Sequence, residues 1–207
     1  MAKALKLRPD KPLVRQNAEA LLKEILSERH VAAAETLLSG WTEARPTDKD
    51  AWHNLGLMLL DKGAIDHAIQ CFKRVHELSP QDNFAVLQLA KLYFQTKKAR
   101  ECLEYCNKLL MRGYEPLLAV GLKARVLNFV GGYEQALNFL EPYLDHNPGN
   151  DTLWVVLSEI HEYRDNYASA IKALQRAKLL LGRSESAKRA DDLHFIEKKL
   201  EQLSNEM

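Results

Sequence analysis

The sequence predicts an all-α protein, a right-handed α-solenoid of helix-turn-helix repeats with a C-terminal capping helix. Two observations carry this prediction. Bulky and small side chains recur in separate columns with a period of 34 residues, and apolar residues within each period follow the three- and four-residue spacing of a helix. No segment shows the strict alternation of apolar and polar residues that is typical of a half-buried strand.

Two columns define the repeat. Bulky apolar side chains recur every 34 positions, at Trp52, Val86, Val120 and Trp154. Sixteen positions after each comes a small side chain, at Ala68, Cys102, Ala136 and Ala170, and the same frame extended toward the N-terminus places Ala18 in the bulky column and Ala34 in the small one. Two helices approach to roughly 8 to 10 Å only where the side chains at their crossing are small. We therefore expect each unit to be a pair of helices that cross at its small residue.

Helix-breaking residues set the limits of these units. A third column holds Pro46, Pro80, Tyr114, Pro148 and Gly182, and proline cannot continue a helix. Between the two helices of a unit lie short polar interruptions such as 61–63 and 130–132, where glycine suits the positive φ of a helix C-terminus. The predicted division is a basic segment at 1–14, five hairpins at 15–48, 49–82, 83–116, 117–150 and 151–184, and a C-terminal capping helix in 185–207.

The capping helix is predicted from an apolar stripe in a charged segment. The stripe comprises Leu193, Ile196, Leu200 and Leu203. This spacing suits a helix packed along the last hairpin, since the end units of such a stack need a cover. The same spacing is also that of a short coiled-coil seam, so self-association through this helix is the alternative.

The repeat resembles the tetratricopeptide repeat, whose 34-residue pattern runs Trp, Leu-Gly, Tyr, then Ala, Phe, Ala and Pro. The matching residues are Trp52, Leu55, Gly56, Ala68, Phe72 and Pro80 in one unit, Leu89, Ala90 and Tyr93 in the next, Gly132, Tyr133, Ala136 and Pro148 in the third, and Trp154, Leu157, Tyr167 and Ala170 in the fourth. Unit 15–48 departs from the pattern, with Ala18 where Trp is usual and Leu22 where a small residue is usual. The resemblance implies stacked hairpins whose first helices line a concave surface.

An apolar groove is expected on that surface. Its predicted partner-binding residues are His53, Asn54, Leu57, Phe84, Leu87, Gln88, Lys91, Leu118, Leu122, Arg125, Val155 and Glu159. The register turns three further aromatic side chains inward, at Phe94, Phe129 and Tyr163. An apolar patch of this size in water would mark a binding surface. The alternative is that some of these side chains pack between adjacent units.

The groove composition predicts the kind of ligand. An amphipathic helix or extended apolar segment suits it, with anchors seated on Phe84, Leu87, Leu118 and Leu122. Lys91 and Arg125 would then set its polarity, and the double change Leu87→Asp with Leu122→Asp would abolish binding while the helices persist. The resemblance also suggests the family's carboxylate clamp for acidic chaperone tails, but of the residues at the aligned positions only Asn54 fits that clamp, which disfavours it.

Residues for catalysis, metals or cofactors form no known motif. The sequence contains no His-Glu-x-x-His, Cys-x-x-Cys, Gly-rich dinucleotide or phosphate loop, or Gly-x-Ser-x-Gly. Cys102 and Cys106 fall in core columns, where the alternative of a thiolate pair is less favoured. His161 is expected to be an interhelical imidazole bonded by a neighbour, with a titrating switch as the alternative. We predict no enzyme activity, cofactor or metal; an enzyme using His53, Glu159 or His161 is the alternative.

Charge and cysteine content narrow the classes of function. Lys and Arg number 29 against 28 Asp and Glu, for a net charge of +1, so no overall excess points to nucleic acid or a membrane surface. Local basic runs near both ends keep an RNA-binding helical repeat as an alternative. An odd number of cysteines, with no signal peptide or membrane-spanning run, predicts a cytoplasmic protein in a reducing compartment.

The function expected from the sequence is that of a non-enzymatic adaptor or scaffold that holds a helix or apolar peptide of another protein in its groove, without nucleic acid or membrane insertion. The alternatives are a bacterial secretion or pilus-assembly chaperone, argued by analogy, and a self-assembling homo-oligomer joined through the C-terminal helix.

Overall fold

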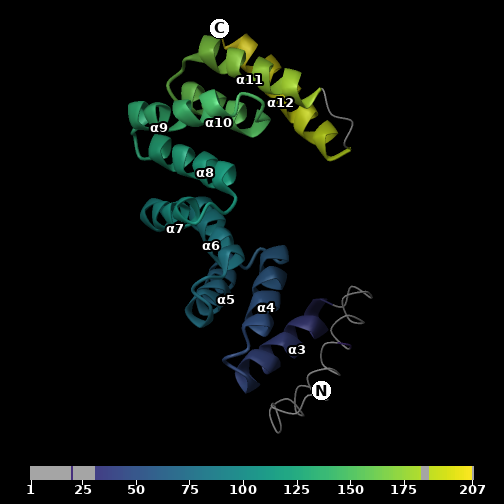
Figure 1. The fold of residues 1–207 in the computed structure, drawn as a ribbon. Helices are drawn as coiled ribbons and strands as arrows, with labels where there is room; N and C mark the ends of the chain where they lie inside the picture. The colour runs from purple at the N-terminus through teal and green to yellow at the C-terminus, as the bar shows by residue number, and fades with distance from the viewer. Residues whose placement is uncertain (1–19, 21–30, 183–186, 207) are drawn as a thin grey trace. The chain divides into compact units, whose positions relative to one another are not determined.

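The computed structural model describes residues 20, 31–182 and 187–206, and within these ranges all regular structure is helical (Figure 1). The basic segment 1–14 and the first helix expected in 15–48, with Ala18 and Leu22, lie outside the described residues. The helices are α3 (Val31–Ala44), α4 (Lys49–Asp61), α5 (Ile65–Leu78), α6 (Asn83–Gln95), α7 (Ala99–Met111), α8 (Pro116–Phe129), α9 (Tyr133–His146), α10 (Asp151–Glu162), α11 (Tyr167–Leu181) and α12 (Ala187–Asn205). The all-α prediction is confirmed.

The 34-residue period is visible in where the helices begin. The second helices of successive hairpins start at equivalent positions, at Val31, Ile65, Ala99, Tyr133 and Tyr167. Among the first helices, α4, α6 and α10 keep the same register, and α8 begins one residue early at Pro116. The preceding Glu115 adopts a left-handed conformation with φ 43°, and proline is favoured in the first turn of a helix. The local sequence therefore accounts for this one shift.

The turn inside each hairpin places one residue in the left-handed region. These residues recur at the period of the repeat, with φ 73° at Gly63, 57° at Lys97, 87° at Gly131 and 56° at Asp165. The expectation of a positive φ is confirmed at the two glycines. Lys97 and Asp165 adopt it as well, although this conformation is costly for a residue with a Cβ. The turn is therefore imposed by the hairpin geometry and not by glycine alone.

Polar side chains cap the first helices at one repeated position. The carboxylates of Asp48 and Asp82 accept from the N–H groups of Ala51 and Ala85, at 3.3 and 3.0 Å. Asp82 also accepts a hydrogen bond from Lys49 Nζ at 3.1 Å, which ties the start of α6 to the start of α4. Burial would raise the pKa of Asp82, but the hydrogen bonds from Ala85 and Lys49 outweigh it and hold this pKa below its ordinary value.

The two tryptophans of the bulky column make the same contact in different hairpins. Trp52 Nε1 donates to the carbonyl oxygen of Pro46, and Trp154 Nε1 to that of Pro148, each at 3.0 Å. In both cases the indole satisfies a carbonyl at the end of the preceding unit, where proline interrupts the helical hydrogen bonds. These two tryptophans therefore also join neighbouring hairpins.

The small column is buried, as residues at helix crossings must be. Its described members are fully buried, each with 0% of its surface exposed: Ala34, Ala68, Cys102, Ala136 and Ala170. A second small column, which the family pattern implied with Gly56 and Ala90, runs along the first helices at Gly56, Ala90, Ala124 and Ser158. A Cβ on Gly56 would lie only 3.0 Å from the ring of Phe72. Both columns permit the close approach on which each hairpin depends.

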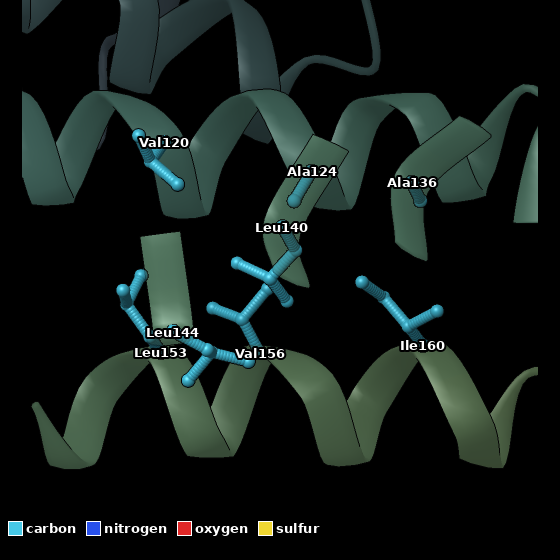
Figure 2. Close-up of a cluster of buried hydrophobic side chains, with 8 residues drawn as sticks. All are labelled: Val120, Ala124, Ala136, Leu140, Leu144, Leu153, Val156 and Ile160. Carbon is cyan, nitrogen blue, oxygen red and sulfur yellow. The ribbon is translucent and has the colours of Figure 1, made fainter. Parts of the chain in front are cut away.

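The chain forms two compact units, divided within α6 between Leu92 and Tyr93. In unit 1, which ends at Leu92, α4 packs against α3 and α5. Its largest fully buried side chain is Phe72. In unit 2, which starts at Tyr93, α8, α9 and α10 enclose one cluster of buried side chains: Val120, Ala124, Ala136, Leu140, Leu144, Leu153, Val156 and Ile160. Figure 2 shows the α10 side chains of this cluster directed toward those of α8.

Helix α12 covers the last hairpin. Ile196 and Leu203 are each 1% exposed and pack with residues of α11, and Leu193 and Leu200 lie at the border of this cluster. Lys178 on α11 pairs with Glu197 on α12 at 2.8 Å. The predicted cap is confirmed. Because its apolar stripe is covered by α11, that stripe does not form an open coiled-coil seam in this structure.

Gly63→Ala tests the strain at the hairpin turn. No atom lies within 4 Å of a Cβ added there, so only the backbone conformation opposes the change, and we expect a loss of about 1–2 kcal/mol in the free energy of unfolding. The matched control is Gly149→Ala, which is equally open but lacks a positive φ and should be neutral or slightly stabilising. Lys97→Gly should raise stability. Urea unfolding followed by circular dichroism measures all three, and equal effects of the two alanine changes would contradict the assignment.

Ile196→Ala tests the packing of the cap. Removing this buried side chain should lower the free energy of unfolding by about 2–4 kcal/mol, because a cavity is left against α11. Phe195→Ala, one residue earlier on the same helix, removes a larger side chain that is 54% exposed, and should cost much less. Hydrogen exchange of the α11 amides provides the local measurement, and unchanged protection in the Ile196 variant would argue that α12 does not stabilise the last hairpin.

Candidate functional site

Unit 2 contains a cavity of about 600 Å³ between its first helices. The lining comes from the end of α6 and the turn after it, from α8 and from α10: Tyr93, Phe94, Gln95, Lys97, Ala99, Arg125, Val126, Asn128, Phe129, Glu159, Ile160 and Tyr163. Aromatic and aliphatic side chains predominate. Apolar walls with a few convergent polar groups are the usual character of a binding pocket.

Two exposed aromatic side chains border this cavity. Phe129 and Tyr163 occupy the same repeat position on α8 and α10, and 47% and 58% of their surfaces are exposed. Phe94 on α6 adds a half-buried ring to the same wall. All three were expected to face inward from the register. Aromatic surface left in water is a common anchor site for a partner.

A bidentate ion pair forms part of the same wall. Arg125 Nε lies 2.5 Å from Glu159 Oε2, and Arg125 Nη2 lies 3.1 Å from Glu159 Oε1. The two residues hold equivalent positions 34 apart, so the pair bridges the first helices of successive hairpins. Both also line a smaller hollow of about 210 Å³, together with Val155 and Phe195. Because the two charges neutralise each other, this part of the site has little attraction for an ion.

Asn128 is the polar residue in the wall of the cavity that lacks a complete set of bonds. Its side chain is 6% exposed, and Oδ1 has no hydrogen-bond partner among the residues that the structure describes. Most buried polar atoms in proteins are paired. The wall of the cavity therefore contains an amide whose oxygen is shielded from solvent and unpaired among the described residues.

Part of the predicted groove is corrected by the structure. The expectation that Leu87 and Leu122 are open to a ligand is wrong, because they are 7% and 6% exposed. For Leu122 the reason is visible at its neighbour Gly121, where a Cβ would lie 3.4 Å from Val156 on α10. Helices α8 and α10 are in contact at this level of unit 2. A charged side chain at Leu87 or Leu122 would therefore disturb helix packing, so a loss of binding in such a variant would not identify a binding site.

The remaining predicted groove residues divide between the two units. In unit 1, the His53 ring stacks on that of Phe84 with centroids 4.6 Å apart. Leu57 and Gln88 are half-buried there, and Asn54 and Lys91 are exposed. In unit 2, Leu118 is half-buried, while the cavity and the smaller hollow bring together Arg125, Val155 and Glu159. The binding role of all these residues stays a prediction.

The cysteines lie in the core, as the columns indicated. Cys71, Cys102 and Cys106 are buried thiols that form no disulfide, and the sulfur atoms of the last two lie 3.9 Å apart. Burial raises the pKa of Cys71 to about 11, and the hydrogen bond with Cys106, together with burial, raises that of Cys102. Neither is a ready nucleophile, since the thiolate is the reactive form. Within the described part of the chain, no three His, Cys, Asp or Glu side chains are arranged to hold a metal ion.

His161 has the hydrogen-bonded environment expected for it. Its Nδ1 lies 3.1 Å from the hydroxyl of Tyr133 on α9. Burial lowers the pKa of His161, and the carboxylate of Glu141 only partly opposes this shift. The neutral imidazole is therefore the form that the fold favours.

Asn128 is one of the cavity residues that the sequence did not single out. Equivalent positions on the other first helices hold Leu60, Phe94 and Glu162, so the column has no common chemistry that would single it out. The signal available was an amide side chain near the end of a first helix, next to an aromatic residue. Its missing bond depends on neighbours that only the folded chain brings together.

Comparisons with known proteins agree with this architecture. Residues 50–82 match the model of the tetratricopeptide repeat. Anaphase-promoting complex subunit 3 of Schizosaccharomyces pombe is 24% identical over 154 residues, which are 74% of this chain and 22% of that protein. The chain thus spans about a fifth of the length of the curated relative it matches.

Solved structures show the same fold. A fragment of MamA from Desulfovibrio magneticus RS-1 superposes with a TM-score of 0.69 at 16% identity, covering 83% of this chain and 97% of that one. YrrB, described as a tetratricopeptide repeat protein with an unusual peptide-binding site, gives 0.64 at 14% identity and covers 86% and 90% of the two chains. A tetratricopeptide repeat protein from Parabacteroides merdae gives 0.69 at 15% identity, covering 92% and 76%.

Fold and repeat chemistry define the class as an α-solenoid of helical hairpins. Within that class, residues 50–82 match the tetratricopeptide repeat, and the chain shares its fold with solved tetratricopeptide repeat proteins. In the ranges that the structure describes, no helix has both the length and the apolar character needed to span a membrane.

The His161 environment predicts a pH dependence of stability. Its folded-state pKa lies below the unfolded value of about 6.5, so the unfolded chain binds the proton first as pH falls. This contribution to stability is therefore full above pH 6.5, is lost as pH falls below it, and levels off below the folded-state pKa. Urea unfolding at pH 7.5 and pH 5 should show that His161→Gln removes this contribution. His67→Gln, at an exposed position, is the control, and an identical pH response of both variants would contradict the prediction.

Proposed function

We propose that the protein is a non-enzymatic adaptor that binds a segment of a partner protein in the cavity of unit 2. The observation that supports this most directly is the pair of exposed aromatic side chains, Phe129 and Tyr163, on the rim of an apolar cavity of about 600 Å³. That volume falls within the ordinary range of ligand pockets, roughly 300–1,000 Å³. It is sufficient for one or two large side chains of a peptide.

The occupant we propose is a peptide segment with an aromatic or large aliphatic anchor. The ion pair of Arg125 with Glu159 supports this choice, because the guanidinium is already neutralised and offers little to an acidic tail. Apolar contact with Phe94, Phe129 and Tyr163 would then supply most of the affinity. The peptide-binding site named for YrrB supports a peptide as ligand by analogy of fold only.

The proposal also covers the division of the chain into hairpins and the compartment in which the protein acts. We divide it into hairpins at 15–48, 49–82, 83–116, 117–150 and 151–184, followed by the cap in 185–207. We also propose that the protein acts in the cytoplasm, since its odd set of three buried thiols suits a reducing compartment.

Phe129→Asp and Tyr163→Asp test the cavity. The probe is the peptide most strongly enriched from a random heptapeptide library displayed on phage and selected against the full chain. We expect an aromatic or large aliphatic residue at a fixed position of that peptide, and at least about a 10-fold weaker Kd for each variant because an apolar anchor contact becomes a charged one. Fluorescence anisotropy measures the affinity, and circular dichroism checks the fold.

Met111→Asp is the matched control. Met111 is 88% exposed and lies outside the residues that line the cavity, so the same type of change there should leave peptide affinity unaltered. Failure to enrich any peptide, or equal affinities for the Met111 and Tyr163 variants, would refute the proposed site.

A further inference from the structure

We infer that Asn128 recognises a main-chain N–H of the bound segment, so that the cavity takes polypeptide in an extended conformation and not as a helix. This inference rests on the proposed function and specifies the ligand of the same site. It starts from the buried amide of Asn128, which lines the cavity while its Oδ1 has no hydrogen-bond partner within the described residues.

The unpaired oxygen is costly in the free protein. A buried carbonyl that has lost water without gaining a donor destabilises the fold, whereas an apolar group of similar shape at the same place does not. Asn128 is 94% removed from solvent, since 6% of its surface is exposed. Natural chains rarely keep such a group in a core. Its position in a cavity wall provides a reason: a ligand can bring the missing donor.

The strongest donor nearby on α8 is already in use. The Arg125 guanidinium binds the Glu159 carboxylate through Nε and Nη2 at 2.5 and 3.1 Å. If Arg125 left Glu159 to donate to Asn128, the half-buried Glu159 carboxylate would lose its partner, which would destabilise the fold. A donor from a bound molecule would pair the Asn128 oxygen and leave the ion pair of Arg125 with Glu159 intact.

The surroundings of Asn128 identify the class of donor. Phe94, Phe129 and Tyr163 line the same cavity, so the donor must belong to a molecule that is apolar next to it. An extended peptide has this character, because each apolar side chain is flanked by main-chain N–H and C=O groups free to bond. In a helix the same N–H groups are bonded internally beyond the first turn.

A side-chain amide suits this role by its geometry. Oδ1 is shielded from solvent in the free protein, and a half-turn about χ2 would exchange its place with that of Nδ2 without moving the rest of the residue. The same amide can then accept from an N–H of the peptide and donate from Nδ2 to a C=O. The other first helices have Leu60, Phe94 and Glu162 at this position, none of which offers both groups. The arrangement is therefore particular to α8.

Asn128→Leu gives a first test that needs no ligand. Because the unpaired acceptor is replaced by an apolar group of the same branching, the midpoint of thermal unfolding should rise by about 2–4 °C. The control is Asn147→Leu, where the amide does have a partner, donating to the Tyr143 carbonyl oxygen at 2.9 Å, and where the midpoint should fall. A lower midpoint for Asn128→Leu would overturn the inference, since it would mean that the amide is already satisfied.

The second test measures binding with the heptapeptide selected from the phage library. Asn128→Leu and Asn128→Ala should each weaken its Kd by about 5- to 15-fold, the usual effect of one lost hydrogen bond in a buried site. A set of peptides, each N-methylated at one residue, should contain one near the anchor with a similar loss on the wild-type protein. On the Asn128 variants, that methyl group should weaken the Kd little further, as expected when two changes remove the same hydrogen bond.

The outcomes separate this inference from the proposed function. If no peptide binds, or if binding ignores Tyr163→Asp, the adaptor proposal fails and the inference fails with it. If binding depends on Phe129 and Tyr163 but is unaffected by both Asn128 variants, the cavity is a peptide site and the inference alone is overturned. Additive losses from N-methylation and Asn128→Leu would likewise overturn it.

Discussion

Close approach of paired helices at residues without bulk is the constraint on which this structure depends. The residues of the small column are completely buried: Ala34, Ala68, Cys102, Ala136 and Ala170. A larger side chain at any of these points would separate the helices and expose the apolar side chains on both. Because one hairpin cannot bury both of its faces, neighbouring hairpins must stack and the last must be covered. The cap α12, the proline-bound tryptophans and the pairing of Lys49 with Asp82 all serve that stacking.

Different side chains adopt the same turn conformation in successive hairpins. The turn residue with positive φ is a glycine in two hairpins, Lys97 in a third and Asp165 in a fourth. Helix packing on both sides of the turn determines its conformation, so a residue that suits it poorly is strained into place. The caps show the converse, since Asp82 and Asn150 suit the role locally and use the same type of bond to a backbone N–H.

Residue types at equivalent positions of successive hairpins differ most where packing does not restrict them. Along the inward edge of the first helices, one column contains Gln95, Phe129 and Tyr163 and another contains Lys91, Arg125 and Glu159. From these unequal residues unit 2 assembles an aromatic rim and an ion pair that neutralises itself. The repeat thus supplies a regular scaffold, and its departures from regularity supply the site. Likeness to proteins such as MamA and YrrB therefore extends to the scaffold, at 14–16% identity.

The sequence by itself determined the period, the hairpins, the buried small column and the capping stripe, because each follows from helical spacing and the size of single side chains. Register also placed Phe129 and Tyr163 on the inward edge. Tertiary structure decided which inward residues stay accessible: Leu87 and Leu122 are buried, and Leu122 adjoins the point where α8 touches α10. It alone also paired Arg125 with Glu159 and left Asn128 without a partner. Spacing along a helix sets the direction of a side chain, whereas exposure and bonding depend on the distance to the next helix.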